Sequence, residues 1–295
     1  MWLLSGMTAM GAVLCGQFGW CSALAGLAAA LLLYNIVGTD TPLPTFARGL
    51  QALWLAVPLC AAAKGAAALF PDAGNGWYVP AVTLALGWLL ARRKREAVGA
   101  CCTVVGFFVL AAVGVVVIFA VPGLRLSWLA PEFDWRGALL AFALGSGGFV
   151  VSQASGGKPG RGWGVCAYVV PVLLSAVTAA ALSPRLAAMQ PSAFYTLSRS
   201  ISVFGVVERF EALIAACLSL GIFCACAAIL CAARSLCPEK YADGLSAALC
   251  LAALVGTQTT SGGVIFAAGT AILWVLLPLI KNMRKMKKGV DKSAS

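Results

Sequence analysis

The chain has 295 residues, of which 61% are hydrophobic and 11% charged, and its net charge is +11 at pH 7. An ordinary soluble protein carries roughly 25% charged residues, so this composition excludes a soluble globular domain. A helix needs about 20 apolar residues to cross a bilayer, so the chain has room for about ten spans and none for a soluble catalytic domain. We therefore expect an all-α, polytopic transmembrane bundle in the cell membrane, and not an enzyme.

The apolar runs between charged or Pro- and Gly-rich breaks predict ten helices. Those of the first half cover residues 2–15, 20–37, 50–70, 77–90 and 98–121. Those of the second half cover residues 135–151, 164–182, 207–233, 244–257 and 262–280. The first run is too short to cross comfortably at a rise of about 1.5 Å per residue. No basic residue precedes it, so we expect mature structure and not a secretion signal.

The positions of Lys and Arg predict the orientation. Most of the 21 fall on the side reached after even-numbered helices, chiefly in residues 92–95 and 281–292. Because cytoplasmic loops carry the excess of basic residues, we expect both termini in the cytoplasm. The expected organisation is one transmembrane domain, residues 1–281, followed by a basic tail, residues 282–295. This tail is expected to anchor on the anionic leaflet, with docking of a partner as the alternative.

The two halves of the chain suggest two repeats of opposite orientation, about residues 1–121 and 133–281, as in many transporters. Gly145-Ser146-Gly147-Gly148 in the sixth run is the strongest candidate for a helix break that exposes backbone to a ligand. Three glycines in four residues each cost roughly 1 kcal/mol of helix stability relative to alanine. Close helix packing explains the same residues equally well. The equivalent place in the first half holds Gly6 and Gly11.

Charged residues near apolar runs are the other candidates. Lys64 lies inside the third run, where a charge costs about 2.5 to 3.5 kcal/mol at the bilayer centre, so it either reaches the outer interface or has a coupling or ligand role. Glu208-Arg209-Phe210-Glu211 opens the eighth run. Glu208 and Glu211 share a helix face and suit a helix start. The alternative is an ionic contact, involving Arg209, that fixes the entrance of this helix.

Several kinds of site are missing from the sequence. The chain has 12 cysteines but no histidine, and most of the thiols lie in apolar runs, so we expect buried small side chains and no metal site, disulfide framework or cofactor. No phosphate-binding loop is present. The basic residues are not interleaved with aromatic residues on one face, so we expect no nucleic-acid partner.

The stretch around the eighth run resembles a known family. Ile201-Ser202, followed by Glu208-Arg209-Phe210-Glu211-Ala212, is similar to the "I-S-x-x-x-x-x-E-R-x-E-A/S" pattern of the spore germination protein GerAB family. Residues 191–200, which precede this pattern, resemble the stretch that precedes it in that family. Residues 16–20 (GQFGW) resemble its "A-G-x-D-x-W" approach to the second helix, and residues 129–131 (LAP) resemble its "R/L-P" loop. The basic tail, residues 282–295, is also similar to that family.

The resemblance implies a ten-helix fold of the amino acid permease (LeuT/APC-like) type, with inverted repeats and broken first and sixth helices. It implies the permease-like subunit of a spore germinant receptor, which senses a small molecule such as an amino acid in the spore inner membrane with A-type and C-type subunits as partners. The alternatives are a stand-alone secondary amino acid transporter and a membrane scaffold that has lost its ligand site. The expected ligand-facing residues are Gly145 to Gly148 and Gly11.

Overall fold

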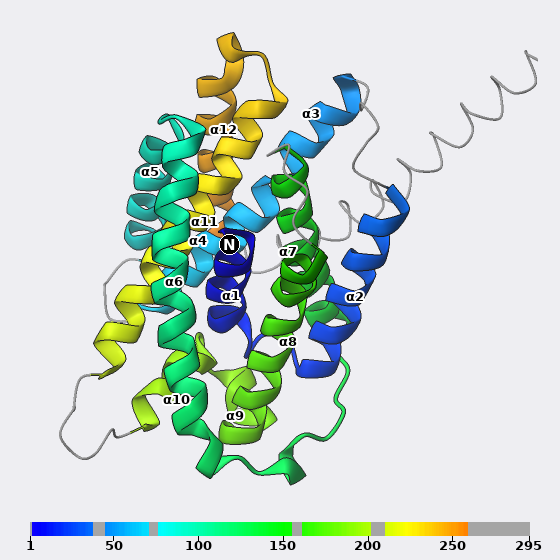
Figure 1. Cartoon of the computed structure of the whole chain (residues 1–295), viewed down its shortest axis with the longest axis vertical. Helices are drawn as coiled ribbons and strands as arrows, with labels where there is room; N and C mark the ends of the chain where they lie inside the picture. Colours follow the sequence, from blue (N-terminus) through cyan, green and yellow to red (C-terminus); the bar gives the residue numbers. More distant parts are fainter. Residues whose placement is uncertain (1, 38–44, 71–75, 155–160, 202–209, 259–295) are drawn as a thin grey trace, which may run out of the picture.

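The computed structural model describes residues 2–37, 45–70, 76–154, 161–201 and 210–258, and these parts are helical, without strands. The helices form one bundle, which confirms the all-α fold (Figure 1). Their bounds are α1 Trp2–Leu14, α2 Trp20–Val37, α3 Thr45–Trp54, α4 Ala56–Ala68, α5 Tyr78–Ala91, α6 Arg95–Ala120, α7 Trp135–Ala154, α8 Arg161–Leu182, α9 Pro184–Met189, α10 Ala193–Ser200, α11 Phe210–Leu236 and α12 Glu239–Gln258. Two short 3-10 turns, Val121–Gly123 and Leu126–Trp128, follow α6. The predicted run 262–280 and the basic tail lie outside the described residues.

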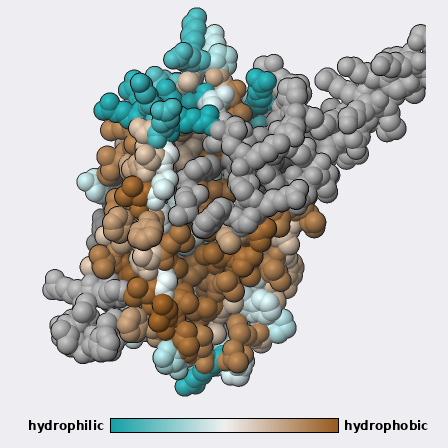
Figure 2. Space-filling model, in the orientation of Figure 1, coloured by the Kyte–Doolittle hydropathy of each residue, from teal (hydrophilic) through white to brown (hydrophobic). Residues whose placement is uncertain are grey.

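Four of the described helical segments are long and apolar enough to cross a membrane: Gln51–Ala68, Arg95–Gly123, Gly164–Leu182 and Glu211–Leu236. Shorter apolar helices stand beside them, including Leu3–Leu14 and Tyr78–Ala91. Hydrophobic side chains cover the middle of the visible surface, and the hydrophilic ones gather at its two ends (Figure 2). The structure is therefore compatible with a location in the membrane.

Helix α1 is the centre of the bundle. It contacts α4, α6, α7, α8, α10 and α11, which surround it (Figure 1). Ala9, Ala12 and Val13 are fully buried, as are nearly all the described side chains of α1. Its 13 residues span about 20 Å, less than the hydrocarbon core. The short first run is thus a buried core helix and not a lipid-facing span.

The predicted helix 50–70 is divided in two at Leu55, between α3 and α4. Pro58 stands four residues after Trp54. Proline has no N–H to donate to the carbonyl four residues earlier, and its ring clashes with that carbonyl. The bend at Leu55 follows from this missing hydrogen bond.

The connection between α1 and α2 is non-helical backbone in which Cys15, Gly16 and Phe18 are buried. Ser175 Oγ of α8 lies 2.8 Å from the carbonyl oxygen of Phe18 and 3.3 Å from that of Cys15. The Phe18 side chain is fully buried. Backbone without helical hydrogen bonds is tolerated inside a bundle when other protein groups supply the missing hydrogen bonds. The hydroxyl of Ser175 is such a group here.

The short helices α9 and α10 were not predicted. They pack against the connection after α1: a β-carbon on Gly16 would clash with the carbonyl oxygen of Ala187 and lie 2.7 Å from Cβ of Ala193. Ser183 precedes α9 with a positive φ of 73°, and its hydroxyl accepts a hydrogen bond from the Leu186 N–H at 3.5 Å. Elements of six and eight residues carry too few apolar positions to stand out in the sequence.

Candidate functional site

Helix α7 carries the glycine-rich segment that was predicted to be a break. It is a continuous α-helix from Trp135 to Ala154, so the predicted interruption at Gly145 to Gly148 is wrong. Its start is fixed by Asp134, whose carboxylate accepts hydrogen bonds from the Arg136 and Gly137 N–H groups, both at 3.1 Å. Because glycine lowers the stability of a continuous helix, the packing of α7 against its neighbours must offset this loss.

Each of the three glycines faces a different neighbour at close range. A β-carbon on Gly145 would lie 2.9 Å from Cβ of Ala30 on α2, and one on Gly147 would lie 2.6 Å from Cγ of Pro58 on α4. One on Gly148 would lie 2.9 Å from Cδ1 of Leu3 on α1. Small residues let membrane helices approach in this way, so close packing, the alternative interpretation, describes the geometry.

The hydroxyl of Tyr168 adds a hydrogen bond to this contact region. It donates to the carbonyl oxygen of Gly145 at 3.1 Å. The Ser146 side chain is also buried, and its hydroxyl oxygen has no hydrogen-bond partner among the described residues. Gly145 and Ser146 therefore belong to a packed face of α7.

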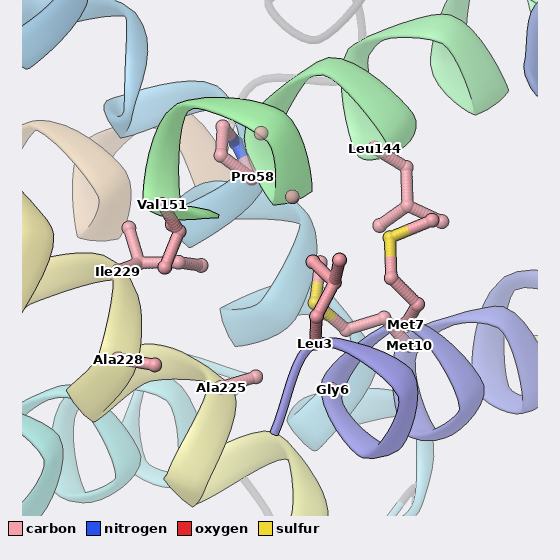
Figure 3. A pocket seen from close by; sticks show the side chains of 12 residues that line it. Leu3, Gly6, Met7, Met10, Pro58, Leu144, Val151, Ala225, Ala228 and Ile229 are labelled. Atoms are coloured by element: carbon pink, nitrogen blue, oxygen red, sulfur yellow. The ribbon is translucent and has the colours of Figure 1, made fainter. Parts of the chain in front are cut away.

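Gly147 and Gly148 line a small cavity between α1, α4, α7 and α11 (Figure 3). The cavity volume is about 30 Å³. Leu3 and Met7 of α1 and Leu144 of α7 point into the same space. The complete lining is Leu3, Gly6, Met7, Met10, Pro58, Leu144, Gly147, Gly148, Val151, Ala225, Ala228 and Ile229.

The chemistry of the cavity wall is apolar. No lining residue carries a charge or a side-chain hydrogen-bond donor. Two residues of this wall belong to the first half of α1: Leu3 lies in its first turn and Gly6 in the next. The first N–H groups of a helix have no partner within it, and this end carries a partial positive charge. The wall suits a small apolar group, and the helix start suits an anionic one.

The structure separates the other predicted residues from this cavity. Gly11 lies against α8, where a β-carbon would be 2.7 Å from Cβ of Pro171. Lys64 is half-buried in α4, four residues before its last residue Ala68. Glu211 lies in the first turn of α11, as its helix-start interpretation predicted. Glu208 and Arg209 lie outside the described residues.

The sequence interpretation missed Pro58, Met7 and Ala225 as cavity residues. Pro58 was the one available signal, because a proline within an apolar run marks a bend in the helix. Met7 and Ala225 gave none, since an apolar residue in a membrane helix has the same appearance whether it faces lipid, a neighbouring helix or a cavity.

An ion-pair network lies at the end of the bundle where α5, α11 and α12 meet. Arg234 donates a hydrogen bond to Asp243, and Arg92 Nε lies 3.6 Å from the same carboxylate. The guanidinium of Arg92 also stacks on Trp88, 4.9 Å from the ring centre. The indole N–H of Trp88 donates to Ser246 Oγ at 3.0 Å. These contacts tie three helix ends together.

Asp243 lies in the polar first turns of α12, before the apolar run that begins at Gly244. The hydrogen bond from Arg234 holds the pKa of this carboxyl below its usual range, and the charges of Arg234 and Arg92 act in the same direction. The carboxylate is about half exposed. It is therefore ionised at neutral pH and available to both arginines.

The sequence matches no protein-family model and no curated protein.

Proposed function

We propose that the chain is the permease-like membrane subunit of a germinant receptor, which senses a small molecule such as an amino acid. The observation that carries this proposal is the cavity that the buried helix α1 and the glycines of α7 help to line. Sites for small ligands in helical membrane transporters lie within the bundle, near helix ends that supply partial charge. The resemblance of residues 201–213 to the GerAB family supplies the functional class.

The apolar wall of the cavity would suit the small apolar side chain of an amino acid. The side chain would occupy the space beside Met7 and Gly148, and the carboxylate would face the start of α1. Burying an unpaired carboxylate costs several kcal/mol, so the partial positive charge of this helix end is the feature that makes the site acceptable.

The fold proposed for the complete chain is the ten-helix, five-plus-five arrangement of the amino acid permease type, with both termini in the cytoplasm. The basic loop of residues 92–95 supports this orientation, because it joins α5 and α6 at one end of the bundle. Arg125 lies in the connection between α6 and α7 at the opposite end, and Arg136 lies in the first turn of α7.

A ligand-dependent thermal shift tests the sensing role. The full chain, in lipid nanodiscs, is screened against a panel of common L-amino acids. A receptor subunit shows a raised unfolding midpoint with at least one of them, and Gly147→Leu abolishes this shift because its side chain collides with Pro58. Gly114→Leu is the matched control, since a β-carbon there meets nothing within 4 Å. If Gly147→Leu keeps the full shift, the proposed site is wrong.

Co-purification tests the receptor assignment itself. The chain is expected to carry A-type and C-type receptor subunits through purification when it is expressed with them. A stand-alone transporter would instead take up labelled amino acid into vesicles that contain this chain alone. Absence of uptake under any ion gradient removes that alternative.

The small volume of the cavity favours a second candidate, a scaffold subunit without ligand binding. A cavity of about 30 Å³ is far below the roughly 300 to 1,000 Å³ of pockets that hold drug-sized ligands. A scaffold predicts stable binding of partner subunits with no amino-acid effect on the unfolding midpoint. The thermal-shift panel therefore separates the two candidates.

A further inference from the structure

Two thiols are in contact across the interface between α6 and α11. The Sγ atoms of Cys101 and Cys224 lie 4.0 Å apart, and both cysteines are reduced. The adjacent thiol of Cys102 donates instead to the backbone carbonyl of Cys224, at a distance of 3.6 Å. Cys101 thus contacts the sulfur of Cys224, whereas Cys102 contacts the backbone carbonyl of Cys224.

The helices that carry this pair are closely packed. One turn from Cys224, a β-carbon on Gly221 would lie 2.8 Å from Cγ2 of Val109 on α6 and 2.7 Å from Cβ of Ala9 on α1. Gly106 of α6 faces Ser5 of α1 at a similarly short distance, 2.5 Å from its built β-carbon to the Ser5 Cβ. The contact of Gly221 with Val109 holds α11 against α6, and the contacts with Ala9 and Ser5 hold both helices against α1, so the two sulfurs remain neighbours.

A disulfide requires the sulfurs to come within about 2.05 Å, which is about 2 Å closer than they stand. Rotation of the two side chains about χ1 is the smallest change that would bring the sulfurs together. The proposed reaction therefore needs movement of these two side chains.

Access favours Cys101 as the residue that reacts first. It is partly exposed, whereas Cys102 and Cys224 are buried. It lies six residues after Arg95, the first residue of α6, or about 9 Å along the helix axis. A small uncharged oxidant that partitions into the bilayer near the helix end at Arg95 can reach this depth.

We propose that Cys101 and Cys224 form an oxidisable pair, and that a peroxide converts them to a disulfide that joins α6 to α11. The Cys101 sulfur attacks the peroxide, takes one oxygen to become a sulfenic acid, and one water molecule leaves. The Cys224 sulfur then attacks the sulfenic sulfur, the S–S bond forms, and the second oxygen leaves as water. Two thiols and one hydrogen peroxide thus give one disulfide and two waters, and a dithiol reductant reverses the change.

The cross-link has a consequence for the cavity, which rests on the proposed function. Cys224 directly precedes Ala225, which lines the cavity and whose Cβ would lie 3.5 Å from a β-carbon on Gly6 of α1. A bond at Cys224 fixes this part of α11 relative to α6. Any ligand response that needs α11 to move is then lost in the oxidised protein and returns on reduction.

The test uses the full chain in nanodiscs, treated with hydrogen peroxide, alkylated, digested without reductant and analysed by mass spectrometry. The expected product is a pair of peptides that contain Cys101 and Cys224, joined with the loss of two hydrogen atoms and separated by dithiothreitol. Cys101→Ala and Cys224→Ala each remove this product. Cys217→Ala is the matched control on α11 and keeps it.

The assay does not depend on a ligand, so its failure is distinguishable from failure of the sensing role. Linkage of Cys101 to Cys102, or oxidation of Cys101 to sulfinic acid without a linked peptide, would overturn the proposal. Because the product is sought first in the unaltered chain, misfolding of a variant cannot hide a negative result.

Discussion

Gly147 of α7 lies directly against Pro58 of α4, and a β-carbon on this glycine would stand 2.6 Å from Cγ of the proline. The proline that bends the preceding segment thus occupies the space that the glycine leaves open. This contact forms one wall of the cavity, and both residues line it.

Gly147→Ala is expected to destabilise the protein by about 1 to 3 kcal/mol, because the added methyl group overpacks a closed contact and the proline ring cannot rotate away. The unfolding midpoint in a mild detergent measures this loss. Gly114→Ala adds the same methyl group to a helix position with nothing within 4 Å, so its midpoint should stay at the wild-type value or rise slightly. Equal midpoints for the two variants would contradict the close packing of α7 on α4.

Ser175→Ala is expected to lower stability by about 0.5 to 1.5 kcal/mol, because it removes the hydroxyl that serves the carbonyls of Phe18 and Cys15. Hydrogen exchange should also rise at the connection between α1 and α2. Ser219→Ala is the control, because its hydroxyl donates to the carbonyl of Ala215 in its own helix, at 2.7 Å. Unchanged exchange in the Ser175 variant would show that this connection is held by other contacts.

Met7→Ala is expected to cost about 2 to 5 kcal/mol, as is typical when a long side chain is removed from a packed interior. Met7 is 4% exposed and lines the cavity, whereas Met189 is 75% exposed. Met189→Ala should therefore change the unfolding free energy by no more than about 0.5 kcal/mol. Comparable losses in both variants would place Met7 outside the core.

The Arg234–Asp243 contact predicts a pH dependence with a defined sign. The pKa of Asp243 is lower in the folded protein than in the unfolded chain, so its contribution is present above the unfolded pKa and is lost as the pH falls through the folded one. The wild type should lose stability relative to Asp243→Asn below about pH 4, the usual range for this carboxyl. A constant difference between the two proteins across the acidic range would argue against the ion pair.

Most of the described helices could be predicted from the sequence, because apolar runs bounded by charges or by Pro and Gly are a strong signal in a membrane protein. The predicted run 20–37 coincides with α2, and 164–182 falls within α8, which begins three residues earlier. The bend before Pro58 was missed because the apolar run continues through it. The helices α9 and α10 were missed because short elements at an interface lack a full apolar run.

The candidate site was only partly predictable. Gly147 and Gly148, which the glycine content singled out, line the cavity, but composition alone does not distinguish a helix break from a packed helix face. That distinction depends on what stands opposite, here Pro58 and Leu3, and these partners are distant in the sequence. Gly11 illustrates the same limit, because its partner Pro171 lies on α8.

Ligand-induced stabilisation of the wild type and of Gly148→Ala tests the central claim most directly. The atoms nearest to a methyl group added at Gly148 belong to the flexible side chains of Leu3 and Met7, so the variant should fold while its cavity is narrowed. With the L-amino acid that most raises the wild-type midpoint, Gly148→Ala should need at least about tenfold more ligand for the same shift, which corresponds to about 1.4 kcal/mol of binding free energy. Gly114→Ala should respond as the wild type does. An unchanged ligand requirement in Gly148→Ala, or no shift with any amino acid in the wild type, would contradict a ligand site between α1 and α7.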